Sequence, residues 1–194
     1  MATVEIKGGK QLDAMLKYLS KKAEFNDVVR VGFLENSTCG YDNNASAPMV
    51  AAIQNYGAPA ASIPRRPFFT IMVKRDSMYW GAWMEKALVK TNYDFPKVLA
   101  LMGQKIGDNL QQSMVDTDSP PLSEITRMLR MMRKKGGPNF KVTGKIVGEA
   151  AARVAAGERA SGINEAILLD SKNLLRAVGY EVNSQGEVKA NESA

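Results

Sequence analysis

The chain contains no histidine and only one cysteine, Cys39, among its 194 residues. Without histidine, neither a Ser/His/Asp triad nor a Cys/His pair can form, and the commonest zinc ligand is missing. A lone thiol excludes an internal disulfide and any metal site that needs several cysteines. These absences remove the commonest kinds of nucleophilic and metal-dependent catalysis.

Long apolar runs are missing as well. No uninterrupted apolar stretch approaches the roughly 18 residues that a membrane helix requires. The first ten residues, MATVEIKGGK, also lack the apolar core of a signal peptide. We therefore expect a protein that is made and kept in the cytosol and has no membrane partner.

Two ligand-binding motifs begin but are not completed. Gly144 and Lys145 are followed by Ile146, where a phosphate-binding P-loop needs Ser or Thr. Residues 42–44, Asp-Asn-Asn, are adjacent, whereas a calcium loop places its ligands at alternate positions. A Ser/Lys dyad stays open, but nothing resembles a nucleophile elbow. We expect no cofactor and no enzymatic activity.

Composition indicates a globular chain with a basic surface. With 45% hydrophobic and 24% charged residues, the sequence is typical of one folded domain. The net charge of +6 and the pI near 9.4 favour contact with polyanions without requiring it. Eleven methionines supply flexible side chains for irregular packing and for adaptable contact surfaces.

The stretch Ala47–Phe69, APMVAAIQNYGAPAASIPRRPFF, organises the rest of the chain. Pro48 suits the first position of a short helix, and Gly57 suits its end. Prolines then predict a stiff, exposed connector that delivers two phenylalanines into the next helix, at Pro59, Pro64 and Pro67.

Hydrophobic spacing predicts most of the other elements. An amphipathic helix is predicted at Gly9–Ala23, and a strand at Asp27–Glu35 that rests on it. Two long helices, starting at Pro67 and at Pro96 with Asp94 as cap, are joined by few residues and should form an antiparallel hairpin. Later elements are predicted as a helix from Pro120 capped by Ser119, a weaker helix at Glu149–Ala156, a short helix capped by Asp170, and a strand at Val178–Val182.

These elements divide the chain into few parts. We expect residues 1–182 to form a single α+β domain, with residues 136–164 as an inserted or mobile segment. Residues 183–194 should form a polar C-terminal tail, since they lack apolar periodicity.

Three motifs in order resemble the tail-completion or neck proteins of long-tailed bacteriophages, a family of minor tail and virion morphogenesis proteins. They are VAAIQNYG with IPRRPFF, PPLSEIT at Pro120–Thr126, and ILLDSKNLLRAVGYEV at Ile167–Val182. The sequence departs from the family pattern at Ser171-Lys172, where Thr-Gly is usual, and in the greater length of the 136–164 segment.

The resemblance implies an α+β fold, in which a small antiparallel sheet packs with several helices, one pair of them forming a long helical hairpin. It also implies a structural virion protein of the phage neck, a ring subunit that joins the DNA-filled head to the tail. Its partners would be copies of itself, head connector proteins and tail terminator proteins. It would be found in the host cytoplasm during assembly and then in the neck or tail region of the virion.

Three alternatives stay open for function. The chain is equally compatible with a tail terminator that caps the tail tube. It is also compatible with a DNA-binding module that uses a basic helix end, or with a ring whose lumen touches DNA non-specifically.

Two sets of residues are candidate contact sites. Phe and Arg are enriched in interface cores, so the first set is predicted to contact neighbouring copies; its phenylalanines have the alternative role of sealing their own core. The second set is a basic patch facing DNA or a partner, with a solvated helix end as the alternative. The first set is Arg65, Arg66, Phe68 and Phe69, and the second is Arg130, Arg133, Lys134 and Lys135.

Overall fold

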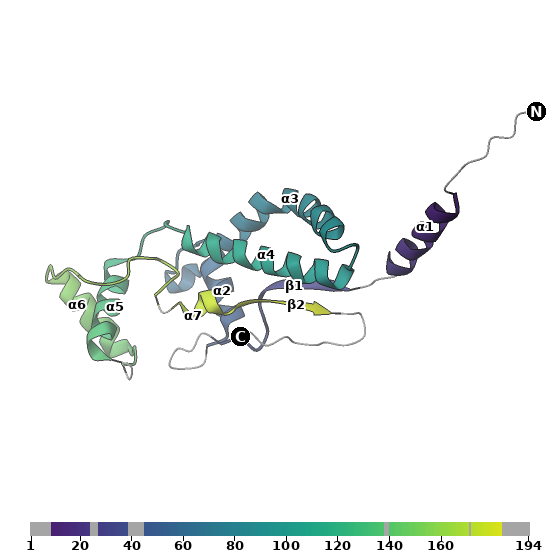
Figure 1. The fold of residues 1–194 in the computed structure, drawn as a ribbon. Helices are drawn as coiled ribbons and strands as arrows, with labels where there is room; N and C mark the ends of the chain where they lie inside the picture. The colour runs from purple at the N-terminus through teal and green to yellow at the C-terminus, as the bar shows by residue number, and fades with distance from the viewer. Residues whose placement is uncertain (1–8, 24–26, 39–44, 138–139, 171, 184–194) are drawn as a thin grey trace, which may run out of the picture.

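The computed structural model describes residues 9–23, 27–38, 45–137, 140–170 and 172–183. Within these ranges the chain has an α+β fold, as predicted, with helices around one two-stranded antiparallel sheet (Figure 1). Cys39 and the tail after Asn183 lie outside the described residues. The elements are α1 (Gly9–Ala23), β1 (Val28–Phe33), α2 (Ala47–Tyr56), the 3-10 helix η1 (Pro59–Ala61), α3 (Phe68–Lys90), α4 (Phe95–Val115), α5 (Glu124–Gly136), α6 (Gly144–Ala155), α7 (Asn173–Arg176) and β2 (Val178–Asn183).

The helix predicted at Gly9–Ala23 is confirmed with these bounds, but its predicted place against the first strand is wrong. Helix α1 lies apart from the rest of the molecule (Figure 1). Leu12, Met15 and Leu16 on its apolar side are more than half exposed. Amphipathic spacing predicted the helix correctly, because that signal is local. It carried no information about the surface that the helix covers.

Helix α4 covers the sheet instead. Strands β1 and β2 pair in register, with Val31 opposite Tyr180. Gly103 of α4 faces them, and a Cβ added there would lie 2.5 Å from the Tyr180 ring and 3.0 Å from Val29. Glycine at this position therefore lets the helix backbone approach the strands closely.

The main core lies between the helical hairpin α3–α4 and the elements packed on it. The two helices run antiparallel, as predicted from their short connection (Figure 1). Asp94 caps α4, as predicted, because its carboxylate accepts a hydrogen bond from the Lys97 N–H at 3.3 Å. The buried side chains of this hairpin include Phe68, Met72, Val98, Met102, Ile106, Leu110 and Met114.

Helix α5 begins later than predicted. Its cap is Ser123, not Ser119, and the Ser123 hydroxyl accepts a hydrogen bond from the Thr126 N–H at 3.1 Å. Pro120 precedes another proline, which disfavours helical geometry at Pro120, so the helix starts after the pair and its cap is the serine that follows them. The buried face is also shifted, since Met128 is fully buried while Ile125 is 36% exposed.

A second, smaller core forms between α5 and α6. The helix predicted at Glu149–Ala156 begins earlier, at Gly144, because the Thr143 hydroxyl accepts from the Ile146 N–H and caps it there. Residues 144–155 of the 136–164 segment therefore belong to a helical pair with its own apolar contacts. We call residues 124–155 the α5–α6 lobe; its buried apolar side chains are Met128, Met131, Met132 and Ala150.

The short helix α7 and the strand β2 follow the prediction, except for the residue that precedes α7. Asp170 does not cap α7; the residue before the helix is Lys172, in a left-handed conformation. The Asp170 carboxylate binds arginines of α5 instead. The strand predicted at Val178–Val182 is confirmed and extends by one residue, so Asn183 belongs to β2 and not to a tail.

Candidate interaction surfaces

The connector after α2 folds back on that helix and is not an extended arm. Gly57 has a φ of 79°, and a Cβ there would lie 3.0 Å from the Arg65 backbone nitrogen, so the turn requires glycine. The Ala58 N–H donates to the Ile63 carbonyl at 2.9 Å, and the Arg66 N–H donates to the Gln54 carbonyl at 2.8 Å. The segment is therefore a closed loop that stays on its own chain, and not an arm that reaches a neighbour.

The four predicted contact residues of this region occupy different environments. Phe68 is 1% exposed and packs edge-to-face with Phe33, with ring centroids 6.2 Å apart. It fills the core of its own chain, which is the second of the two roles that the sequence left open. Arg66 is also buried, at 7% exposed. Only Arg65 and part of Phe69 lie on the surface, so an interface at this connector would rest on those two side chains.

Arg66 ties the connector to the chain segment before α5. Its side chain donates to Gln54 Oε1 at 2.9 Å and to the Pro120 carbonyl at 3.4 Å. Burial lowers the pKa of Arg66 from its ordinary value, and the like charge of Arg130 lowers it further. The guanidinium still carries its charge at neutral pH, so two arginines share the junction between the main body and the α5–α6 lobe.

Asn55 holds α2 against the start of α3 and was missed by the sequence analysis. Its side chain is 3% exposed; Oδ1 accepts from the Phe69 and Thr70 N–H groups at 3.1 and 3.2 Å, and Nδ2 donates to Thr70 Oγ1 at 3.0 Å. Pro67, which precedes α3, gives that helix no side-chain cap. Asn55 therefore caps α3 from another helix, an arrangement that no local spacing reveals.

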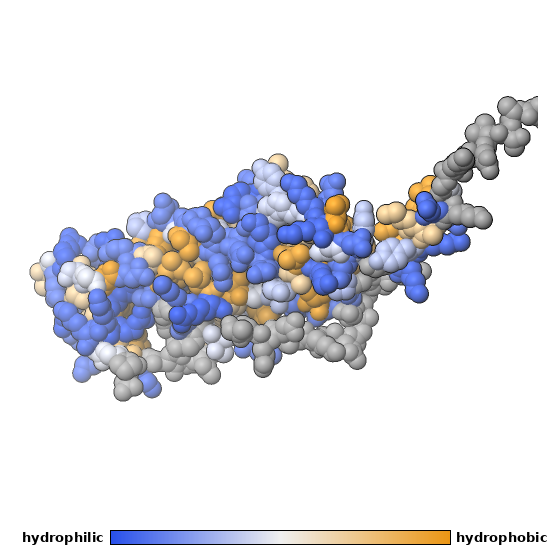
Figure 2. All heavy atoms as spheres, viewed as in Figure 1, coloured by the Kyte–Doolittle hydropathy of each residue, from blue (hydrophilic) through white to orange (hydrophobic). Residues whose placement is uncertain are grey.

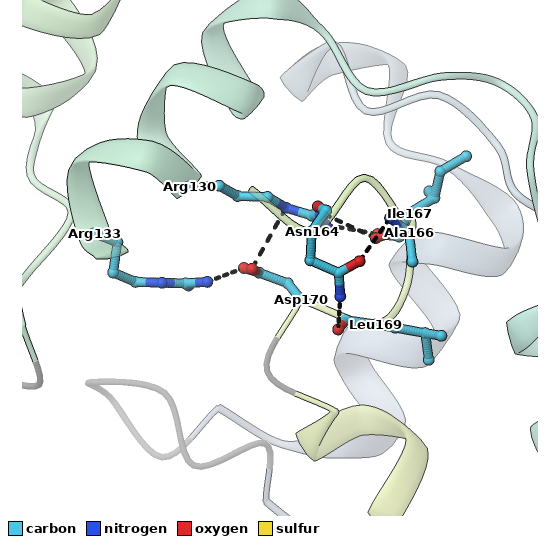
Figure 3. Close-up of polar contacts among 7 residues, drawn as sticks. All are labelled: Arg130, Arg133, Asn164, Ala166, Ile167, Leu169 and Asp170. Carbon is cyan, nitrogen blue, oxygen red and sulfur yellow. Dashed lines mark hydrogen bonds and ion pairs between the residues drawn. The ribbon is translucent and has the colours of Figure 1, made fainter. Parts of the chain in front are cut away.

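Arg130 of α5 binds a chain segment that is distant in sequence (Figure 3). Its Nη1 donates to the carbonyls of Asn164 and Ala166 at 2.6 and 2.8 Å, and its Nη2 donates to the Ile167 carbonyl at 2.9 Å. Its Nε lies 3.6 Å from the Asp170 carboxylate, and the side chain is only 8% exposed. This residue holds the 164–170 segment on α5.

Two of the other three members of the predicted basic patch also bind later segments of the same chain. Arg133 forms an ion pair with Asp170, and Lys134 donates to the Gly162 carbonyl at 2.6 Å. Lys135 is exposed. Both interpretations of the patch need correction for Arg130, since a buried side chain bonded to three carbonyls is neither a DNA-facing charge nor a solvated helix end. The sequence did not show this because the partners lie more than 30 residues away.

The three motifs that carry the phage resemblance meet around one hollow. Its volume is about 220 Å³. Gln54 comes from the first motif, Thr126 from the second, and Ile167 and Leu174 from the third. Segments that are scattered along the sequence therefore share one site in the fold, at the junction of the body and the α5–α6 lobe.

A charged cluster on the α3–α4 hairpin was also missed. Asp76, 6% exposed, accepts two hydrogen bonds from Arg75, at 2.7 and 2.9 Å, and one from Asn109 Nδ2 at 3.0 Å. The bonds from Arg75 are the main cause that lowers the pKa of Asp76, although burial opposes the shift. The same hydrogen bond raises the pKa of Arg75. Both groups stay charged at neutral pH.

Neither the ligating side chains nor the comparisons with known proteins assign a function to this chain. In the described ranges, no group of three or more His, Cys, Asp or Glu side chains is arranged to hold a metal ion, and no helix there is long and apolar enough to cross a membrane. Comparison with protein-family models, with curated proteins and with solved structures gives no match.

Proposed function

We propose that this chain is a structural virion protein of the phage neck, a ring subunit that joins the DNA-filled head to the tail. The observation that carries the proposal is the shared hollow, because the three motifs behind the resemblance contribute to one junction in the fold. The α+β fold with its helical hairpin also fits the resemblance.

The exposed apolar surface supports an assembled state. Large apolar side chains are more than half exposed on three separate helices, Leu12 on α1, Tyr56 on α2 and Met78 on α3. Ring subunits use two different surfaces for head-to-tail contacts that close by rotation. A chain with apolar groups on several faces is suited to contacts with copies of itself and with other virion proteins.

The first experiment asks whether the protein forms rings and is part of the particle. We expect negative-stain electron microscopy of the purified protein to show closed rings. Mass spectrometry of particles from the phage that encodes it should find it in mature virions. A protein that stays monomeric at every concentration and is missing from mature particles would refute the proposal, as would a turnover reaction.

The tail-terminator alternative is separated by a phage mutant that lacks this chain. A neck component should leave complete heads beside tails of normal length. Tails of uncontrolled length would instead identify a terminator.

The DNA-binding alternative is separated by salt dependence. Phosphate neutralisation predicts a log-log loss of affinity with slope of about 0.9 per phosphate contact. Because Arg130 and Arg133 bind the 164–170 segment, we expect retention on a polyanion column to vanish at modest ionic strength.

A further inference from the structure

Helix α3 has apolar residues on the side that faces away from its own core. Ile71, Met78 and Val89 are 51%, 75% and 68% exposed, and Ala82 is exposed between the last two. The helix lies at the outer edge of the body, with α4 on its other side (Figure 1), and Figure 2 shows a mixture of apolar and polar residues over it. Single apolar residues on a surface need no explanation, but a line of them along one side of a helix is typical of a packing face.

The exposed residues on this side have the spacing of a coiled-coil seam. They follow one another at intervals of three and four residues, which keeps them on one side of the helix. All of them are exposed, whereas the buried residues of α3 lie on a different side. We call the following six residues the α3 seam: Ile71, Arg75, Met78, Ala82, Glu85 and Val89.

The chemistry of the α3 seam is symmetric about its middle. Each residue before position 80 has a complementary residue at the same distance after it. A large apolar side chain is matched with a small one, a cation with an anion, and one apolar side chain with another. When two copies of such a helix pack antiparallel about a two-fold axis at position 80, the matched residues meet. They are Met78 with Ala82, Arg75 with Glu85, and Ile71 with Val89.

Arg75 is positioned to bind a carboxylate of a second copy. Its Nε and Nη2 donate to the Asp76 carboxylate at 2.7 and 2.9 Å, which fixes the guanidinium on α3 and leaves the Nη1 donors for another acceptor. The Arg75 side chain is 47% exposed, and Glu85 is exposed on the same side of the helix. In the antiparallel arrangement each Arg75 meets the Glu85 of the other copy, so the pair contains this contact twice.

Helix α1, which also has an exposed apolar side, fits the α3 seam less well. Its segment contains several lysines and a single acid, Asp13, which pairs with Lys17 of the same helix. It therefore offers no acid to Arg75 and would bring its lysines against those of α3. Antiparallel pairing of α3 avoids such contacts, because Lys74 and Lys86 lie on opposite sides of the seam and do not face each other.

We propose that the α3 seam is a self-association surface, on which two copies of this chain pair through antiparallel α3 helices. Met78 of each copy lies against Ala82 of the other, and Arg75 of each copy forms an ion pair with Glu85 of the other. This two-fold contact differs in symmetry from the head-to-tail contacts that build a ring. It therefore goes beyond the proposed function and does not depend on it, since free chains can pair in this way and so can two rings.

Reversing the charge of Glu85 tests the pairing by sedimentation velocity. Glu85→Arg should raise the dissociation constant of the dimer about tenfold or more, because two ion pairs are lost and two like-charge contacts replace them. Added salt should narrow the difference from the wild-type chain. The control Glu149→Arg makes the same change of charge on the exposed surface of α6 and should leave the constant within about threefold. Equal effects of the two changes would refute the pairing.

The same variant also tests the antiparallel orientation. In a parallel pair Glu85 would lie against Glu85 of the other copy, and Glu85→Arg would replace one like-charge contact by another. An unchanged dissociation constant would therefore refute the antiparallel arrangement. Circular dichroism confirms that the variant is folded.

Cross-linking between two single-cysteine chains gives an independent measurement. In a Cys39→Ser background, Met78→Cys is placed on one chain and Ala82→Cys on another that carries a mass tag. After mixing, a short bismaleimide should link the two chains into a covalent dimer. The control pair, Met78→Cys with Met84→Cys, should not link, because Met84 is partly exposed on a different side of α3.

The outcomes separate this inference from the proposed function. Rings that form without the Met78–Ala82 link would refute the pairing and leave the proposed function standing. Linked dimers that form no rings and are missing from mature virions would support the pairing and count against the proposed function. A link formed only within one chain that carries Leu16→Cys and Met78→Cys would place α1 on the seam and refute the pairing. A chain that stays monomeric at every concentration would refute both.

Discussion

Replacing Arg130 by Met should release the 164–170 segment from α5. The methionine keeps much of the aliphatic stem but removes the donors to three carbonyls and the contact with Asp170. Hydrogen bonds from a charged donor contribute about 1.5–3 kcal/mol each, and breaking a buried charged network costs about 3–5 kcal/mol in total. Because Asn164 is exposed and water can replace part of what is lost, we expect about 3 kcal/mol, at the low end of that range.

Urea denaturation with two signals measures this effect. Trp80 and Trp83 lie in α3, so their fluorescence reports the main core, whereas far-UV circular dichroism reports all helices. The variant should lose helical signal at lower urea than fluorescence, because the α5–α6 lobe has a separate core. Hydrogen exchange followed by mass spectrometry should show the loss of protection concentrated in residues 124–155.

The matched control is Arg153→Met on α6. Arg153 pairs with Glu149 one turn away on an exposed surface, and such pairs contribute about 0.3–0.5 kcal/mol. If Arg130→Met and Arg153→Met destabilise the protein equally, the assignment of Arg130 as the residue that holds the 164–170 segment is refuted.

Three further predictions address the main body. Asp76→Asn should destabilise the protein at pH 7. Because the pKa of Asp76 is lowered in the folded state, its contribution to the free energy of unfolding is complete above the unfolded pKa near 3.9 and is lost as pH falls through the folded pKa. The stabilities of the two proteins should therefore converge in acid titrations, and parallel curves would contradict this. Gly103→Ala should lower the free energy of unfolding by about 1–3 kcal/mol, because the new methyl group meets Tyr180. The control Gly81→Ala has open space around it and should be neutral or stabilising in thermal melts. The reverse order would refute the packing of α4 on the sheet. Phe68→Ala should cost about 3–5 kcal/mol in urea unfolding, and a loss below about 1 kcal/mol would show that its ring is not core.

Elements with local signals could be predicted from the sequence. The bounds of α1, the cap at Asp94 and the strand at Val178–Val182 all follow from spacing and capping chemistry within a few residues. The start of α5 was wrong because Ser119 and Ser123 are both plausible caps, and the two prolines between them decide in favour of the second. Local rules therefore predict the helices and strands but leave ambiguity where two signals compete.

Contacts between distant segments could not be predicted. The partners of Arg130 lie 34 to 37 residues away, and a cluster of cations at a helix end predicts solvent or a polyanion equally well. Asn55 similarly binds the next helix, 14 and 15 residues on. Phe68 and Phe69 are adjacent in a motif, yet α3 places the first in the core and leaves the second partly exposed. Only the folded arrangement separates these roles.

Methionine oxidation would affect both cores of this protein. Six methionines are buried in the described chain, three in the main core and three in the α5–α6 lobe. Oxidation to the sulfoxide would introduce a polar oxygen into either core. The exposed thioethers of Met15, Met49 and Met78 are the first that an oxidant reaches. Because Met15 lies on the exposed apolar side of α1, mild peroxide would oxidise this helix before it reaches either core.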